Sequence, residues 1–327
     1  MKKFLLILLL LISFLCLPYH NNDYIDITHM VNVSSVGIDY KNDQYLIYAY
    51  VINNYTMSKN DYNTSSNSKP ATVITSTGKT IEKALFKLYD SVFVKLNFSH
   101  IETLVLQKKF ITTQNVSKLI NYISTNNDFY PKFNIFITDE EISDIYNIDY
   151  FSDTSSYYNI LTEYKSEIEH HHTTFIDLIN DFEENNYFVI YPSLKLNKNI
   201  IRDEKKGNSL YIDGYFYILN GMLNKIDYND NSLLYLLYST NDISFNYNGR
   251  NYFLSGFSIK KFILNKKLYI LFYSKSNYDG NFKDLIRYNI LSLYNKNIDV
   301  YNLRYFNILP ENIIILSVEK KVYKQSL

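Results

Sequence analysis

The sequence lacks tryptophan and holds a single cysteine, Cys16, among its 327 residues. One cysteine cannot form a disulfide within the chain, so packing alone must stabilise the fold. Lysine plus arginine (33) equals aspartate plus glutamate (33). A chain without net charge gives no electrostatic reason to expect nucleic acid or another polyanion as a partner.

Long apolar runs are also missing, except at the N-terminus. Residues 4–17 are uncharged and follow Lys2 and Lys3, but about 14 residues fall short of the roughly 20 that a membrane-spanning helix needs. Polar residues follow at once, so residues 1–20 are predicted to be an export signal. We therefore expect the mature chain to be extracytoplasmic.

Cys16 lies at the end of this run, and two outcomes are open for it. If processing cuts before Cys16, the thiol can carry lipid and tether the chain to a membrane. If the cut falls a few residues later, Cys16 is lost and the mature chain has no cysteine. Leu15 is bulkier than the Gly, Ala or Ser that signal processing prefers before a lipidated cysteine.

Short strand and helix patterns alternate along the first two thirds of the chain. Residues 32–53 predict a hairpin that turns at residues 41–43. Gly78 then ends a strand, and Thr80 is expected to cap a helix over residues 81–93. Further strands are expected at residues 101–110, 132–139 and 187–196, and further helices at 112–126, 139–148 and 173–185, the last capped by Thr173 or Thr174.

This order predicts an α+β (mixed α/β) fold with antiparallel or mixed sheets, covered by helices on one face. The charged, glycine-containing break at residues 197–209 is the expected domain boundary. We expect about three domains: an N-terminal mixed α/β domain at residues 21–196, a small middle domain at 207–247 and a C-terminal α/β domain at 248–327.

The last third has its own series of elements. A hairpin is expected around Gly214 and Gly221, and a short helix at residues 228–240. The C-terminal domain is expected to hold strands at residues 251–264, 267–275 and 312–323 and a helix at 281–295.

Three consecutive histidines, His170, His171 and His172, are the most conspicuous candidate for chemistry. Zinc ligands on a helix lie one turn apart, whereas three consecutive side chains point about 100° from one another. We interpret the three as a solvated tract, with a weak metal site as the alternative.

Other catalytic signals are weak or missing. Ser255-Gly256 lacks the first glycine of a nucleophile elbow. The acidic groups at residues 139–141 and 183–184 lie at expected helix ends, where carboxylates are common. The glycine-rich phosphate loops are absent from the sequence. We therefore predict no catalytic residue, no metal site and no cofactor, and the sequence leaves the ligand-binding residues unknown.

A collinear series of stretches carries a resemblance to a known family. These are "SSVGIDYKNDQYLIYAYVIN", "GKTIEKALFKL", "NFSHIETLVL", "LINYISTNNDFYPKFNIFITD", "TTFIDLINDF" and "LYIDGYFYILNGMLNKID". In this order the chain, from about Val33 to Tyr305, resembles the Ger(x)C family of spore germination lipoproteins. Members are C subunits of nutrient germinant receptors in endospore-forming bacteria.

The resemblance implies a non-enzymatic, three-domain protein on the outer face of the spore inner membrane. There it would act with two integral membrane subunits, A and B, in nutrient-triggered germination. Cys16 would be the lipid-bearing anchor, carrying an acyl group such as palmitate. The C-terminal domain is short for the family, and neither the germinant nor the residues that contact the partners can be carried over.

Two other functions remain open from the residues themselves. An extracytoplasmic solute-binding or adhesion lipoprotein would show one large cleft between domains. An exported hydrolase would bring two carboxylates, or a serine and a histidine, together in one pocket.

Overall fold

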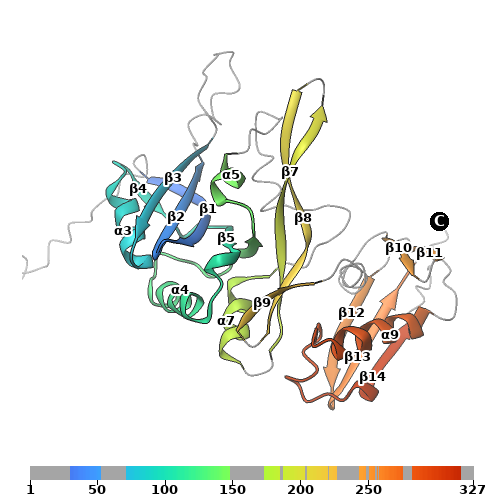
Figure 1. Ribbon diagram of the computed structural model, residues 1–327. Helices are drawn as coiled ribbons and strands as arrows, with labels where there is room; N and C mark the ends of the chain where they lie inside the picture. Colours follow the sequence, from blue (N-terminus) through green and yellow to red (C-terminus); the bar gives the residue numbers. More distant parts are fainter. Residues whose placement is uncertain are drawn as a thin grey trace, which may run out of the picture. The chain divides into compact units, whose positions relative to one another are not determined.

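The computed structural model describes residues 30–52, 71–147, 173–184, 187–202, 205–219, 221–226, 243–247, 250–254, 256, 258–274 and 282–317 (Figure 1). Cys16, the three consecutive histidines, Ser255 and the helix expected at residues 228–240 lie outside these residues. Within the described part of the chain, no helix combines the length and the apolar character needed to cross a bilayer.

A mixed sheet occupies the first part of the chain, in the order β3-β2-β1-β5-β6-β7-β8-β9, with β4 paired to β1. Neighbours among β1, β5, β6 and β7 run parallel, and the flanking pairs run antiparallel. The expected α+β class with mixed sheets is confirmed. The strands are β1 (Met30–Lys41), β2 (Gln44–Ile52), β3 (Ala71–Gly78), β4 (Lys95–Asn97), β5 (Thr103–Gln107), β6 (Asn134–Thr138), β7 (Ile190–Arg202), β8 (Lys205–Leu219) and β9 (Met222–Lys225).

The turn between β1 and β2 lies where the sequence predicted it. Lys41 pairs with Gln44, and the two residues between them, Asn42 and Asp43, have φ angles of 52° and 56°. Asn and Asp adopt this left-handed conformation more readily than most residues, and two such residues suit the right-handed twist of a hairpin.

Threonines begin the helices that cover one face of this sheet. Thr80 caps α3 (Ile81–Asp90), Thr112 caps α4 (Thr113–Thr125), and Thr174 forms a capping box with Asp177 at the start of α7 (Phe175–Glu183). Each side chain accepts a hydrogen bond from a first-turn N–H. The predicted caps at Thr80 and Thr174 are therefore confirmed.

The other face of the sheet is also covered, which corrects the expectation of helices on one face. Leu104 and Leu106 of β5 lie in the core beneath α3, α4 and α7, whereas Val105 between them packs with the short helix α5 (Ile142–Tyr146). Strand β5 is fully buried as a result. Parallel strands with both faces buried are typical of sheets sandwiched between helices.

Gly37 of β1 explains how α5 approaches so closely. A Cβ atom at this position would lie 2.5 Å from Ile142 Cγ2 and 2.9 Å from Tyr146 Cε2. The Tyr146 hydroxyl is 2.7 Å from Ser35 Oγ, which accepts a hydrogen bond from Thr103 Oγ1 at 2.7 Å. A residue without a side chain thus lets α5 lie directly on β1.

Residues 197–209 form paired strands where the sequence predicted a break. Asn197 pairs with Ser209 and Arg202 with Lys205, so β7 and β8 make one long hairpin (Figure 1). Strand β6 pairs with β7 only at Ser193 and Leu194, and from there on the described backbone pairing of β7 is with β8. The division into three domains remains a prediction.

A second, smaller sheet holds β12 (Ser258–Leu264), β13 (Lys267–Tyr273) and β14 (Ile313–Ser317). Helix α9 (Phe282–Asn295) covers it, as Figure 1 shows, and a short hairpin of β10 (Ile243–Tyr247) and β11 (Arg250–Leu254) precedes it. Strand β12 runs antiparallel to β13, and β14 runs parallel to it. This strand, helix, strand order is the one predicted for the C-terminal domain. Two 3-10 helices complete the described elements, at Lys108–Phe110 and Pro310–Asn312.

Candidate functional site

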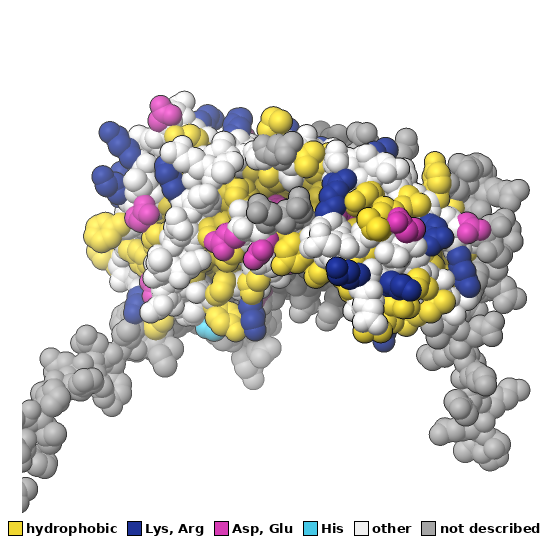
Figure 2. Space-filling view, turned by 90° about the horizontal axis from the view of Figure 1, so that it is seen from below, with side chains coloured by type: hydrophobic (Ala, Val, Ile, Leu, Met, Phe, Trp, Pro, Cys, Tyr) yellow, Lys and Arg dark blue, Asp and Glu magenta, His cyan; other side chains and the backbone are white. Residues whose placement is uncertain are grey.

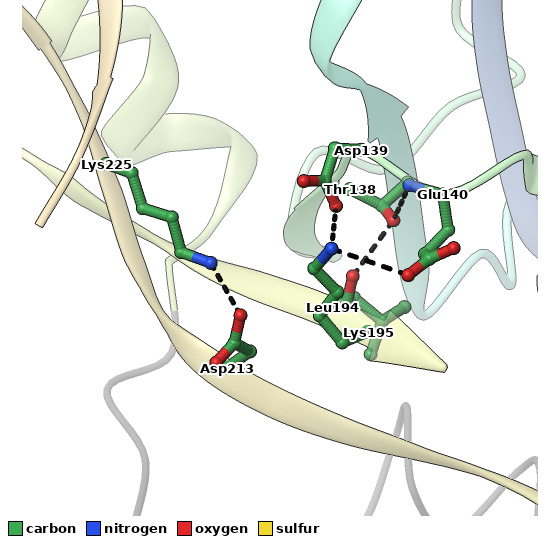
Figure 3. A network of polar contacts seen from close by, with 7 residues as sticks. All are labelled: Thr138, Asp139, Glu140, Leu194, Lys195, Asp213 and Lys225. Atoms are coloured by element: carbon green, nitrogen blue, oxygen red, sulfur yellow. Dashed lines mark hydrogen bonds and ion pairs between the residues drawn. The ribbon is translucent and has the colours of Figure 1, made fainter. Parts of the chain in front are cut away.

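The carboxyl end of β6 and the adjoining middle of β7 bring a group of polar side chains together (Figure 3). The two strands run parallel, with Thr138 of β6 opposite Leu194 of β7. Asp139 and Glu140 follow Thr138, and Lys195 follows Leu194. In sheets with parallel strands, ligands bind at this edge, so it is the first place to look for a site.

Lys195 forms ion pairs with both Asp139 and Glu140. Its Nζ lies 2.7 Å from Asp139 Oδ1 and 3.4 Å from Glu140 Oε1. All three side chains are partly enclosed, with 22% of Lys195, 37% of Asp139 and 24% of Glu140 exposed. One cation therefore neutralises much of the charge of two adjacent carboxylates.

Thr138 ties the same two strands together at the base of the group. Its Oγ1 donates to the carbonyl oxygen of Leu194 at 2.9 Å and accepts from the Glu140 N–H at 3.0 Å. The hydroxyl has thus used its only proton, and it fixes the direction in which the chain leaves β6.

A second ion pair lies nearby, on β8 and β9. Lys225 Nζ is 2.5 Å from Asp213 Oδ2 (Figure 3). Asp213 precedes Gly214, whose φ is 87°, at a point where the register of β7 and β8 shifts between Pro192 and Leu194. A bulge of this kind turns a side chain away from the regular alternation of the strand, which brings Asp213 to Lys225.

The protonation states of these groups follow from the geometry. Burial alone would raise the pKa of Asp139, but the hydrogen bond and the charge of Lys195 outweigh it and lower that pKa. The hydrogen bond to Asp139 raises the pKa of Lys195. A general acid or base needs a pKa near the working pH, and these shifts move both groups away from neutrality. The arrangement therefore suits an ionic clamp better than proton transfer.

A different carboxyl group does titrate near neutrality. Asp181 of α7 accepts a hydrogen bond from the hydroxyl of Tyr191 on β7, at 2.6 Å. Burial raises the pKa of Asp181 to about 7, although the bond from Tyr191 opposes the shift. Tyr191 is fully buried in the main hydrophobic core, so this pair joins helix to sheet and opens onto no described pocket.

Two hollows of the described chain show no gathered chemistry. One lies inside the main core and has an apolar lining that includes Val36, Leu104 and Phe133. Another is an open depression beside α3 and α4, lined by Glu82, Tyr122 and neighbouring polar residues. The Tyr122 hydroxyl there already accepts from Asn126 Nδ2 at 2.9 Å. Neither hollow gathers a serine and a histidine, or two carboxylates.

The acidic residues singled out in the sequence lie at helix ends, as expected. Asp139, Glu140 and Glu141 precede α5, while Glu183 and Glu184 end α7. Glu141 makes no side-chain cap and lies 3.9 Å from Lys41 Nζ. Sequence reasoning missed Lys195; the signal was a lone lysine among apolar residues of a predicted strand.

The other candidates give no site within the described chain. Gly256 lies in a turn before β12, with Ser255 outside the described residues. No group of three or more His, Cys, Asp or Glu side chains that could hold a metal occurs among the residues that the structure describes. The lipidation prediction for Cys16 and the histidine tract fall outside them.

Comparison with known proteins gave two matches. A family model described as "Spore germination protein N-terminal domain" matches residues 23–196. No curated protein matches the chain. Among solved structures, the crystal structure of the GerBC protein is similar over 86% of this chain and 94% of that chain, with 12% sequence identity and a TM-score of 0.37.

Proposed function

The chain belongs to the Ger(x)C family of spore germination proteins, and from this premise we propose that it is the non-enzymatic C subunit of a nutrient germinant receptor. It would act on the outer face of the spore inner membrane with two integral membrane subunits. Its part would be to assemble and support them through its surface.

The family match over residues 23–196 carries this proposal. It spans β1 to β6 and the start of β7. It includes Gly37 and Gly78, which belong to the stretches that resemble the family. Gly37 admits α5 against β1, and a Cβ at Gly78 would lie 2.4 Å from the Ala84 backbone nitrogen of α3. Family-like residues thus occupy positions where this fold requires them.

The polar group at the carboxyl end of β6 and the middle of β7 supports a non-enzymatic role. Asp139 and Glu140 are both engaged by Lys195, and the Thr138 hydroxyl is occupied on both sides. These contacts hold the sheet and α5 in place. They leave no nucleophile beside a free base in that group, and the lowered pKa of Asp139 suits an ion pair better than proton transfer.

Attachment of the chain to the membrane would come from lipid on Cys16, with the predicted export signal cut just before this residue. A subunit of this kind must stay beside partners that are embedded in the bilayer. An N-terminal lipid would keep it there and leave the folded part free to contact them.

Deletion of the gene in the spore-forming host tests the proposal. We expect loss of nutrient-triggered germination, while germination by agents that bypass nutrient receptors stays normal. Restoring the gene should restore the response. Normal nutrient germination of the deletion strain, with the host's other receptors also removed, would contradict the proposal.

Mass spectrometry of the N-terminal peptide tests the anchor separately. The proposal expects a lipid-modified Cys16 at the mature N-terminus and reduced membrane association of C16A. An unmodified N-terminus beyond residue 16, with normal membrane association of C16A, would remove the lipid anchor and leave the family assignment intact.

A further inference from the structure

Among the described elements, helix α9 covers one face of the C-terminal sheet and no helix covers the other. Leu268, Ile270 and Phe272 of β13 are buried in the core that α9 helps to form. Side chains alternate along a strand, so Tyr269 and Leu271 of β13 point to the opposite face. Neither belongs to a described hydrophobic core.

The neighbouring strands extend this uncovered face. Phe262 of β12 and Ile314 of β14 lie beside Tyr269, and Leu316 of β14 lies beside Leu271. Phe262 is 44% exposed, Leu264 54% and Leu316 42%, and the rings of Phe262 and Tyr269 are stacked with centroids 5.0 Å apart. We call this surface the open sheet face; its members are Phe262, Leu264, Tyr269, Leu271, Ile314 and Leu316.

Lysines border the open sheet face. Lys260 pairs with Leu271 and Lys267 pairs with Leu264, which puts both lysines on this face, and Lys266 lies in the adjoining turn. None of the three forms an ion pair with another described residue. Strands β12, β13 and β14 contain no acidic residue. Figure 2 shows lysine and arginine side chains interspersed with hydrophobic ones on the side of the molecule that is seen from below.

The charges argue against two kinds of occupant. A second copy that presents the same face offers no carboxylate to these lysines, because the three strands contain none. An added strand on the β12 edge would meet Lys260 and Lys261, which follow one another, and lysines on an edge strand disfavour such pairing. The composition of the open sheet face itself calls for a surface that is both apolar and anionic.

We propose that the open sheet face docks on an anionic phospholipid membrane. Phe262, Leu264 and Leu316 would enter the boundary between headgroups and acyl chains, while Lys260, Lys266 and Lys267 would contact phosphate groups. Aromatic and aliphatic side chains bordered by lysine are the combination that proteins use at membrane interfaces. This goes beyond the receptor assignment, because it concerns lipid contact by the C-terminal domain and not the N-terminal anchor.

The absence of tryptophan allows a direct test on the full chain. F262W introduces the only indole of the protein on the open sheet face, and F86W introduces it at an exposed phenylalanine of α3, 67% exposed, as the matched control. Both variants keep the N-terminus, so any attachment through it is common to them. The probe is a vesicle of phosphatidylglycerol and brominated phosphatidylcholine in equal parts, compared with one of brominated phosphatidylcholine alone.

We expect the emission of F262W to shift to shorter wavelength and to be quenched by the anionic vesicles, with little change for F86W. Adding K260Q and K267Q to F262W should weaken its vesicle response by about tenfold or more, since each lysine near an anionic surface contributes about 1 kcal/mol. High salt should weaken the response as well.

Three results would overturn the proposal. One is equal quenching of F262W and F86W. Another is no response of F262W, or a response that neither anionic lipid nor the lysines affect. The third is an emission shift that follows protein concentration without vesicles, which would identify a second copy as the occupant. Because the test uses vesicles and no spore, its failure would leave the receptor function untouched.

Discussion

Lys195 Nζ lies 2.7 Å from Asp139 Oδ1, and this contact joins two parallel strands whose residues are more than fifty positions apart in the sequence. The same lysine reaches Glu140 at 3.4 Å. The loop after β6 and the middle of β7 are therefore fixed to each other through one side chain, just before α5 begins.

Replacing this lysine should weaken the fold in a pH-dependent way. K195M leaves two adjacent carboxylates without their cation, and we expect a loss of about 1 kcal/mol in the free energy of unfolding at pH 7, a modest value because the groups are partly exposed. The lowered pKa of Asp139 stabilises the folded state only above its ordinary value of 3.8. The difference between K195M and the parent should therefore shrink as the pH falls below that value.

Urea unfolding at pH 7 and pH 3 measures this difference. K41M is the matched control, because Lys41 is 52% exposed and lies 3.9 Å from Glu141. We expect K41M to change the free energy of unfolding by less than about 0.5 kcal/mol. Equal effects of K195M and K41M would mean that the enclosed pair is worth no more than a surface one.

Gly37 offers a test of the packing of α5. G37A puts a methyl group 2.5 Å from Ile142 Cγ2, and we expect overpacking of this kind to cost about 1–3 kcal/mol in the free energy of unfolding. Replacing Ile142 with leucine removes the branched methyl at that point with little change of volume.

A double-mutant cycle then decides the cause. G37A/I142L should be less destabilised than the sum of the two single variants, because the clash is relieved in the double variant. Thermal or urea unfolding of the four proteins gives the coupling. Simple additivity would show that the contact with Ile142 Cγ2 does not cause the destabilisation of G37A.

Asp181 should make the fold less stable as the pH rises. Its pKa is about 7 in the folded protein and ordinarily 3.8, so the folded state holds a proton that the unfolded chain has lost. The contribution of the protonated group is complete below 3.8 and is lost as the pH rises through 7. This group alone should lower the free energy of unfolding by up to about 4 kcal/mol between pH 4 and pH 8.

D181N removes the titration and should flatten this part of the pH profile, with a gain in stability at pH 8 relative to the parent. Y191F removes the hydrogen bond that favours ionised Asp181, which should raise the pKa of Asp181 further. The free energy of unfolding of Y191F should therefore continue to fall up to a higher pH than that of the parent. Urea midpoints measured from pH 4 to pH 8 provide the test. A parent profile with the slope of D181N would place the pKa of Asp181 in its ordinary range.

The capping box of α7 gives a local prediction. T174A removes the oxygen that accepts from the Asp177 N–H and should lower the free energy of unfolding by about 1 kcal/mol. T125A is the control, because the Thr125 hydroxyl only donates to a carbonyl of its own helix, α4, and is exposed. Calorimetry should show a lower Tm for T174A than for T125A; the reverse order would argue against the cap.

The sequence predicted those parts of the fold that depend on local chemistry. Thr80 and Thr174 precede apolar residues at helical spacing, and the turn at Asn42 and Asp43 follows from residues that tolerate positive φ. The acidic residues after β6 were correctly expected at the start of a helix. Each of these features involves residues within a few positions of one another.

Features that depend on distant pairing were missed. The covering of the second face by α5 rests on Gly37, about a hundred residues earlier, and glycine leaves no periodic signal. The ion pair of Lys195 was missed because its partners, Asp139 and Glu140, lie more than fifty positions earlier in the sequence. Residues 197–209 looked like a break because they are charged, yet β7 and β8 pair there through backbone hydrogen bonds, which leave no mark in the composition.

The position of β1 has a consequence for how the chain folds. Its pairing with β2 closes across a two-residue turn. It also pairs with β4 and β5; β5 begins at Thr103, and the pair Ser35 and Thr103 is separated by 68 residues. A chain that emerges N-terminus first can form the hairpin at once, while the second edge of β1 waits unpaired. Parallel pairings of such separation form slowly, and an open strand edge attracts other chains in the meantime. Strand β1, an interior strand of the finished sheet, therefore has one edge that is open to intermolecular pairing until β5 has been synthesised.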